Sequence, residues 1–86
     1  MSYNGWANRA TWNVSLWINN EEPLYRAAVD FMKRYQPLKY QEDQPYIHFI
    51  EAMEMQKGFT GDDIHWLDSA LDYDELNRMM RDLIAD

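Results

Sequence analysis

The sequence predicts a compact all-α protein, a bundle of about four short helices with an irregular segment before the last helix. Four separate stretches repeat apolar residues three or four positions apart, which is the spacing of one helical face. Each stretch begins at a capping residue or a proline. The 86 residues are too few for two independently stable cores, so we expect residues 1–86 to form a single helical domain.

The first helix is expected to begin after Asn8. The Asn8 side chain can accept a hydrogen bond from an N–H of the first turn, although Thr11 can be the cap instead and would then shorten the helix by a turn. Apolar residues follow on two adjacent flanks: Ala10, Val14, Trp17 and Ile18 on one, Trp12 and Leu16 on the other. A helix that is apolar on two sides is mostly buried, so we expect this one at the centre of the bundle.

The residues before this helix, 1–7, are expected to form an irregular arm. Asn4-Gly5 is a typical turn pair, and Trp6 is expected to anchor the arm to the body of the protein. Residues 4–20 hold three of the four tryptophans. Such aromatic surface is seldom left in water, so it either builds the core or forms a binding face, and the sequence leaves both open.

The second helix is predicted to start at Glu21-Glu22-Pro23 and to end before Pro37. Its start combines carboxylates at the positive end of the helix dipole with a proline in the first turn. Pro37 disfavours the helical state of Gln36 and removes a hydrogen bond. The apolar stripe between these ends is the strongest helical pattern in the chain: Leu24, Ala28, Phe31, Met32 and Tyr35.

A linker over residues 37–43 leads into the third helix. Leu38 and Tyr40 of the linker are expected to cover an edge of the core. The helix is expected to have Pro45 in its first turn and to stop at Gly58, because glycine favours the left-handed conformation that ends many helices. Its apolar positions are Tyr46, Ile47, Phe49, Ile50 and Met53.

The least regular segment, residues 58–70, precedes the last helix. Its apolar residues are expected in a short extended or single-turn piece that folds back on the helices: Ile64, Trp66 and Leu67. Asp72 and Glu75 then form a capping-box-like start, with a carboxylate at the cap and a glutamate three residues on. The amphipathic stripe of the last helix runs nearly to the end of the sequence: Leu76, Met79, Met80, Leu83 and Ile84.

Charge is distributed unevenly along the chain. Residues 1–41 carry +2 and residues 42–86 carry −9, which together give the net charge of −7. An acidic half repels phosphate and anionic lipid, so direct binding to nucleic acid or to a membrane surface is not expected. No apolar run reaches the roughly 18 residues needed to span a bilayer, and the first residues lack the pattern of a signal peptide. The lack of cysteine excludes a disulfide scaffold and suits a reducing compartment, so we expect a soluble cytoplasmic protein.

No residue pattern predicts catalysis, a cofactor or a metal site. His48 and His65 occur in no metal-ligand spacing, and the acidic residues lack the order of a calcium-binding loop. The serines lack a nucleophile elbow, and the three glycines are too scattered for a phosphate-binding loop. We therefore predict that the protein is not an enzyme; an unrecognised active site would need a concave pocket with convergent polar groups. Several methionines either fill gaps in the core or form an adaptable partner surface: Met53, Met55, Met79 and Met80.

The first helix carries a motif that resembles a known family. The run Asn8-x-x-Thr11-Trp12-Asn13-Val14-x-Leu16-Trp17-Ile18-x-Asn20, with Asn4-Gly5-Trp6 before it, is similar to small uncharacterised proteins of bacteriophages and bacteria. Trp66-Leu67-Asp68 and Leu71-Asp72-x-x-Glu75-Leu76 resemble the closing part of that family, whereas residues 36–62 are largely unmatched. The resemblance implies a phage or prophage origin and an accessory protein that acts on host components. It implies no established activity, and the shared residues can serve folding alone, with Asn8 and Thr11 bonding helix ends and the tryptophans filling the core.

The leading functional hypothesis is a small acidic interaction protein that binds a protein partner of unknown identity. Its site would be an aromatic patch ringed by carboxylates and made of Tyr3, Trp6, Trp12 and Tyr40. A first alternative is a duplex nucleic-acid mimic that occupies a basic groove of a host or defence enzyme. The acidic face of such a mimic would be made of Asp62, Asp63, Asp68, Asp72, Asp74, Glu75 and Asp82. A second alternative is a self-associating structural protein, in which a homodimer completes the small core. Salt would weaken the binding of a mimic steeply and that of an aromatic patch little.

Overall fold

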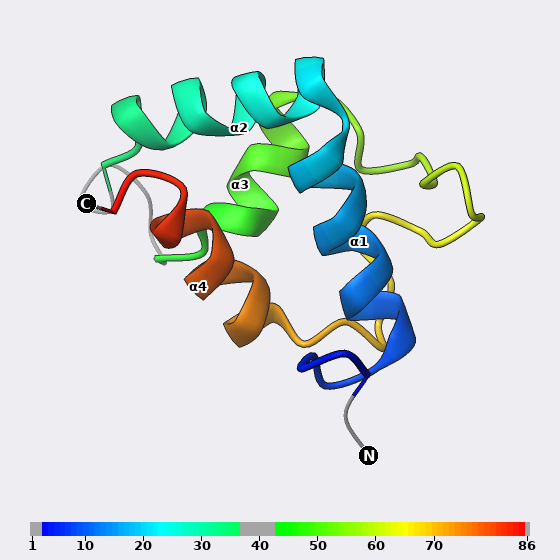
Figure 1. Ribbon diagram of the computed structural model, residues 1–86. Coiled ribbons are helices and arrows are strands. Elements are labelled where there is room, and N and C mark those ends of the chain that lie inside the picture. The colour runs from blue at the N-terminus through cyan, green and yellow to red at the C-terminus, as the bar shows by residue number, and fades with distance from the viewer. Residues whose placement is uncertain (1–2, 37–42, 86) are drawn as a thin grey trace.

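The computed structural model describes residues 3–36 and 43–85, and within these ranges the chain forms four α-helices and no β-strand (Figure 1). This confirms the predicted all-α bundle with an irregular segment before the last helix. None of the helices in the described ranges is long and apolar enough to cross a membrane. The helices are α1 (Arg9–Asn20), α2 (Glu22–Arg34), α3 (Pro45–Ala52) and α4 (Tyr73–Asp82).

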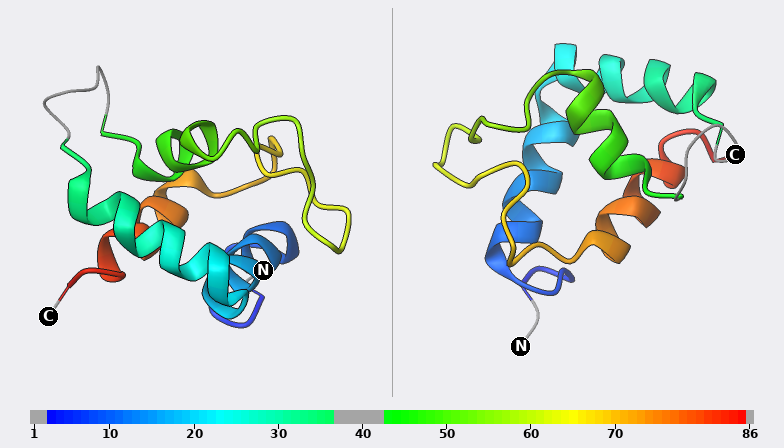
Figure 2. Two further views of the ribbon diagram at one scale, coloured as in Figure 1. Left: turned by 90° about the horizontal axis from the view of Figure 1, so that it is seen from above. Right: turned by 180° about the vertical axis from the view of Figure 1, so that it is seen from behind.

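α1 lies between the other helices and the irregular segment, residues 53–72, which follows its outer side (Figures 1 and 2). α2 contacts each of the other three helices. The shortest helix, α3, supplies four of the largest fully buried side chains: Pro45, Tyr46, Phe49 and Ile50. The opening helix, where we expected the centre of the bundle, supplies four others of this set: Thr11, Asn13, Val14 and Ile18.

The buried positions of α1 differ in kind from those of α3. Val14 and Ile18 face the core, but Thr11, Asn13 and Ser15 are buried as well, and their side chains are polar. The core is completed by residues of every helix and of the irregular segment: Ala28, Met32, Tyr46, Phe49, Ile50, Trp66, Leu71, Leu76, Met79 and Met80. Burial of these side chains is the main stabilising term of the fold.

Local capping fixes where α1 and α4 begin. The Asn8 side chain accepts a hydrogen bond from the backbone N–H of Thr11 at 2.8 Å, which confirms Asn8 as the cap of α1. The Asp72 side chain accepts from the N–H of Glu75 at 3.0 Å, which confirms Asp72 as the cap of α4.

The end of α3 differs from the prediction. The helix ends at Ala52, and Glu54 takes the left-handed conformation with φ 57° that we expected at Gly58. The N–H of Met55 donates to the carbonyl of Ile50, and the N–H of Glu54 donates to that of Glu51, both at 3.0 Å. These two bonds form a Schellman motif, which ends the helix without a glycine. The prediction of Gly58 as the stop is therefore wrong.

The start of α3 is capped by a side chain from α4. Pro45 occupies the first helical position, and the N–H of Tyr46 donates to Oδ1 of the buried Asn77 at 3.0 Å. The Nδ2 group of Asn77 in turn donates to the Gln44 side chain at 2.8 Å. Asn77 therefore supplies the oxygen that a capping side chain of α3 itself would normally provide.

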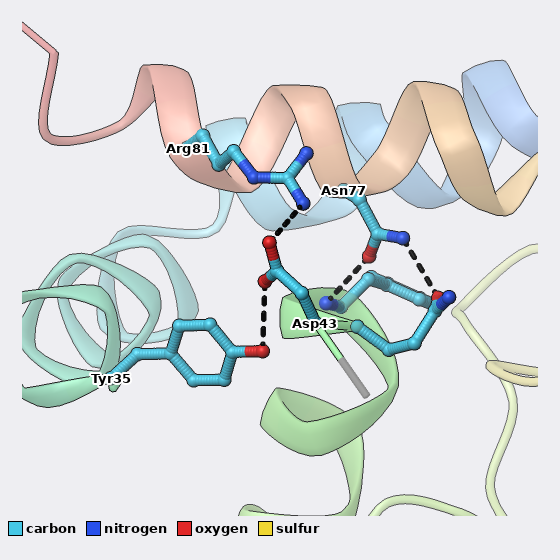
Figure 3. Close-up of polar contacts among 6 residues, drawn as sticks. Tyr35, Asp43, Asn77 and Arg81 are labelled. Atoms are coloured by element: carbon cyan, nitrogen blue, oxygen red, sulfur yellow. Dashed lines mark hydrogen bonds and ion pairs between the residues drawn. The ribbon is translucent and has the colours of Figure 1, made fainter. Parts of the chain in front are cut away.

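Asp43, just before α3, joins two other helices (Figure 3). Its carboxylate accepts from the Tyr35 hydroxyl at 3.1 Å and from the Arg81 guanidinium at 3.0 Å. Burial first, and the bond to Asp43 second, raise the pKa of the Tyr35 hydroxyl to about 12. The predicted linker residues Leu38 and Tyr40 lie outside the described residues.

The irregular segment folds back on the helices, as expected. Phe59 and His65 form an isolated antiparallel bridge, and the N–H of Trp66 donates to the carbonyl of Gly58 at 3.1 Å. Trp66 is buried in the core, and its own carbonyl accepts from the Tyr46 hydroxyl. The segment is thus an ordered loop closed on itself and anchored to α3.

Candidate partner-binding groove

The predicted aromatic patch is divided by the N-terminal turn. The Tyr3 and Trp12 rings lie 4.9 Å apart, and Tyr3 is 38% exposed. Asn4 and Gly5 both have positive φ, 50° and 88°, the combination typical of a type I′ turn, and Tyr3 and Trp6 exchange backbone hydrogen bonds across it. Trp6 packs on the core beside a groove to which Tyr3 and Trp12 do not contribute. Tyr40, the fourth predicted residue, lies outside the described residues.

The groove that contains Trp6 has a volume of about 490 Å³. It is lined by residues of the N-terminal turn, the end of α1, α2 and α4, and Figure 1 shows how these elements are arranged. We call it the α2–α4 groove. Its apolar lining is Trp6, Tyr25, Met79 and Leu83, and its polar lining is Asn19, Glu75, Arg78 and Asp82, with Gly5 at the turn.

Glu75 connects this groove to the N-terminal arm. Its Oε1 atom accepts a hydrogen bond from the backbone N–H of Ala7 at 2.7 Å. In a complete capping box this carboxylate would bond back to the N–H of Asp72. That N–H donates instead to Oγ1 of Thr11 at 2.9 Å, so the Glu75 side chain is available to hold the arm.

The floor of the groove is held by α1 and α4 together. The Nδ2 group of Asn19 donates to the carbonyl of Ser15 at 2.8 Å and contacts Sδ of Met79 at 3.3 Å. Met79 is buried, whereas Tyr25, which lines the same groove from α2, is 39% exposed. The groove therefore offers an exposed aromatic ring beside a fixed apolar floor.

Of the seven predicted mimic residues, four accept hydrogen bonds through their side-chain carboxylates. Asp68 accepts from the N–H of Ala70 at 2.7 Å, and Asp72 and Glu75 are engaged as described above. Asp62 accepts from Nδ2 of Asn13 at 2.7 Å and from the Trp17 indole at 3.0 Å, and these two bonds hold the pKa of the Asp62 carboxyl below its usual range. The remaining residues of the set are exposed, and their side chains make no hydrogen bond or ion pair within the described ranges: Asp63, Asp74 and Asp82.

Sequence reasoning missed a polar network under the irregular segment. Oγ1 of the buried Thr60 donates to Oδ1 of Asn13 at 2.8 Å, and the same Asn13 side chain donates to Asp62. The Nδ2 group of Asn8 reaches the Ala70 carbonyl at 2.6 Å. The motif residues Asn8, Thr11 and Asn13 therefore bind the irregular segment to α1. Asn13 could have been predicted as a buried bonding residue, because it is a polar residue on an otherwise apolar flank of the helix.

Tyr25 and Arg78 of the groove were also missed, because each lies off the apolar stripe of its helix.

The acidic residues and histidines form no metal site in the described part of the chain: among residues 3–36 and 43–85, no group of three or more His, Cys, Asp or Glu side chains is placed to hold a metal ion. The nine residues that line the groove include no serine, cysteine, histidine or lysine. Its chemistry is that of an apolar contact surface with a charged rim.

Comparison with known proteins gives one family. A family model matches residues 1–86, the whole chain, and its description is a family of unknown function, DUF7249. No curated protein and no solved structure matches the chain. The expected membership of an uncharacterised family is confirmed.

Proposed function

We propose that this chain, which belongs to the DUF7249 family of unknown function, acts as a small acidic accessory protein that binds a protein partner through the α2–α4 groove. The observation that supports the proposal is the joint presence of Trp6, Tyr25 and Met79 in one concave site with Glu75 and Asp82 on its rim. Aromatic residues in such positions dominate the energy of many protein interfaces, and methionine adapts to the shape of a partner. The site keeps the predicted chemistry, an aromatic patch ringed by carboxylates, and shares only Trp6 with the predicted residues.

A non-catalytic role is part of the proposal. The polar residues of the groove include no nucleophile paired with a base, and Glu75 is already bonded to the Ala7 backbone. The nucleic-acid mimic receives less support, because four of its seven carboxylates are used to hold caps, turns and the irregular segment. Self-association is the remaining alternative, in which the groove of one copy would be covered by another copy.

The biological setting is proposed from the resemblance of the first helix. A phage or prophage origin and action on a host component are supported by the resemblance of the run from Asn8 to Asn20, and a cytoplasmic location is supported by the lack of cysteine. Small accessory proteins without catalytic residues act by binding, which agrees with the groove chemistry above.

Site-specific photo-cross-linking in lysate of the native host tests this function. One variant carries the cross-linker in place of Tyr25, inside the groove, and the matched control carries it in place of Phe59, which is 59% exposed and lies outside the groove. We expect products from position 25 that are absent from position 59 and that persist when duplex DNA is added. Equal products from both positions, or none from position 25, would contradict the proposal. Loss of the products on addition of DNA would favour the mimic instead.

A further inference from the structure

We infer that the segment bound in the α2–α4 groove is a basic amphipathic helix of the partner protein. The inference rests on the proposed function of the groove and adds the shape and the charge of the occupant. Both follow from residues at the junction of α2 and α4.

The shape follows from a second hollow that continues the groove. This hollow has a volume of about 250 Å³ and is lined by Tyr25, Arg26, Val29, Asp30 and Leu83. It shares Tyr25 and Leu83 with the α2–α4 groove. The two hollows therefore form one apolar track between α2 and α4: Trp6, Met79, Leu83, Tyr25 and Val29.

An elongated apolar track suits a rod-like ligand better than a compact one. An amphipathic helix presents its apolar side chains at i, i+3, i+4 and i+7, and it binds grooves of this kind by burying that stripe. Trp6 comes from the N-terminal turn and Tyr25 from α2, so the two aromatic rings line the track from different elements and can serve as two anchors for the helix.

The charge follows from which lining residues are already neutralised. Three carboxylates line the two hollows: Asp30, Glu75 and Asp82. Of the two lining cations, Arg26 is ion-paired with Glu22, and Arg78 forms no ion pair within the described part of the chain. Arg81, the neighbouring cation of α4, is paired with Asp43.

The carboxylates of the track therefore outnumber the unpaired cations, and the net charge of −7 adds a long-range field of the same sign. Lysine and arginine residues on the edges of the bound helix would complement these carboxylates. A helix with aspartate and glutamate on its edges would be repelled by the carboxylates of the track and by the long-range field of the protein.

The test uses two synthetic peptides of about 18 residues, long enough to form a helix. Both carry leucine at the i, i+3, i+4 and i+7 positions; one carries lysine and the other glutamate at all remaining positions. Fluorescence anisotropy of the labelled peptide gives the dissociation constant. We expect the lysine peptide to bind at least about ten-fold more tightly than the glutamate peptide.

Two double variants separate the groove from the general field of an acidic protein. Asp30→Asn with Asp82→Asn removes two carboxylates of the track, and Asp63→Asn with Asp74→Asn removes two exposed carboxylates outside it. Both variants have the same net charge. We expect the first variant to bind the lysine peptide about ten-fold more weakly than the unaltered protein does, and the second to change the affinity by less than about two-fold.

The inference would be overturned if the two double variants lost the same affinity for the lysine peptide, or if the two peptides bound with the same affinity. A concentration-dependent dimer that Tyr25→Ala abolishes would overturn it as well, because a second copy would then occupy the groove. The outcome for the proposed function is separate. If position 25 cross-links to a partner segment that is not basic, the proposed function stands and the inferred charge of the bound segment is wrong. If position 25 gives no cross-linked product, the proposed function itself is wrong.

Discussion

The carboxylate of Glu75 accepts a hydrogen bond from the backbone N–H of Ala7 at 2.7 Å, across 68 positions of sequence. This bond joins the first turn of α4 to the arm that carries Trp6, which lines the α2–α4 groove beside Glu75. The groove is therefore assembled from both ends of the chain, and its shape depends on a contact that no local pattern encodes.

Removing this acceptor is expected to release the arm. Glu75→Ala should destabilise the protein by about 0.5–1.5 kcal/mol and increase the exposure of Trp6, whereas Glu75→Gln keeps a side-chain oxygen and should lose less. Urea unfolding gives the stability, and iodide quenching of tryptophan fluorescence gives the exposure. Equal stability of Glu75→Ala and the unaltered protein would mean that the arm is held by Trp6 packing alone.

Asn77 is expected to be the most costly polar side chain to remove from α4. Asn77→Ala leaves the N–H of Tyr46 without its acceptor in a buried position and should cost about 1–3 kcal/mol. Arg78→Ala, on the exposed side of the same helix, is the control and should change stability by less than about 0.5 kcal/mol. Similar losses for both variants in urea unfolding would argue against capping of α3 from α4.

Glu54 offers a stabilising substitution. A non-glycine residue with φ 57° is strained, so Glu54→Gly should raise the free energy of unfolding by up to about 1 kcal/mol. Glu51→Gly, in the helical part of α3, should lower it by about 1 kcal/mol. The two variants have the same composition and can be compared in one thermal unfolding series. A loss of stability in Glu54→Gly would contradict the Schellman ending of α3.

The two glycines of the irregular segment are expected to respond differently to alanine. A Cβ atom at Gly61 would overlap the Trp17 ring at Cζ2 and Cη2, and Asp62 holds that ring through its indole N–H. Gly61→Ala should therefore destabilise by about 1–3 kcal/mol. A Cβ atom at Gly58 has its nearest neighbours at 3.5 Å, an ordinary contact, so Gly58→Ala should be nearly neutral. Chemical denaturation of the two variants checks the order, which the reverse ranking would refute.

The attachment of the irregular segment to α1 is expected to weaken in acid. The pKa of the Asp62 carboxyl is lowered in the folded protein by its bonds to Asn13 and Trp17, so the stabilisation is present above the usual value of 3.8 and is lost as pH falls below it. The indole N–H resonance of Trp17 should shift in this range, and the stability difference between the unaltered protein and Asp62→Ala should shrink. A difference that stays constant through the same range would show that the Asp62 charge contributes nothing.

The local features of the fold could be predicted from sequence because they depend on neighbouring residues. Asn8 and Asp72 each cap a helix by bonding the backbone N–H three residues on, and the Asn4-Gly5 turn is closed by its neighbours Tyr3 and Trp6. The end of α3 was mispredicted because Gly58 is the stronger local signal, whereas the hydrogen bonds that end the helix place the left-handed residue at Glu54.

The candidate site was only partly predictable. Trp6 was expected to anchor the arm and to belong to the aromatic patch, and the structure places it in the groove. Tyr25 was not predicted, because it lies off the apolar stripe of α2. It lines a groove only because α4 packs beside α2. The capping of α3 by Asn77 has the same origin, since it requires α3 and α4 to be already packed together.

The most direct test of the central claim uses the four tryptophans as reporters. Trp6 lines the groove, Trp12 pairs with Tyr3, Trp17 bonds to Asp62, and Trp66 is buried in the core. Indole N–H resonances of ¹⁵N-labelled protein would be followed while the lysine peptide is added. We predict that the Trp6 resonance shifts and that the other three stay in place. A shift of Trp12 or Trp17 with Trp6 unchanged would place the binding surface on α1 and contradict the assignment of the α2–α4 groove.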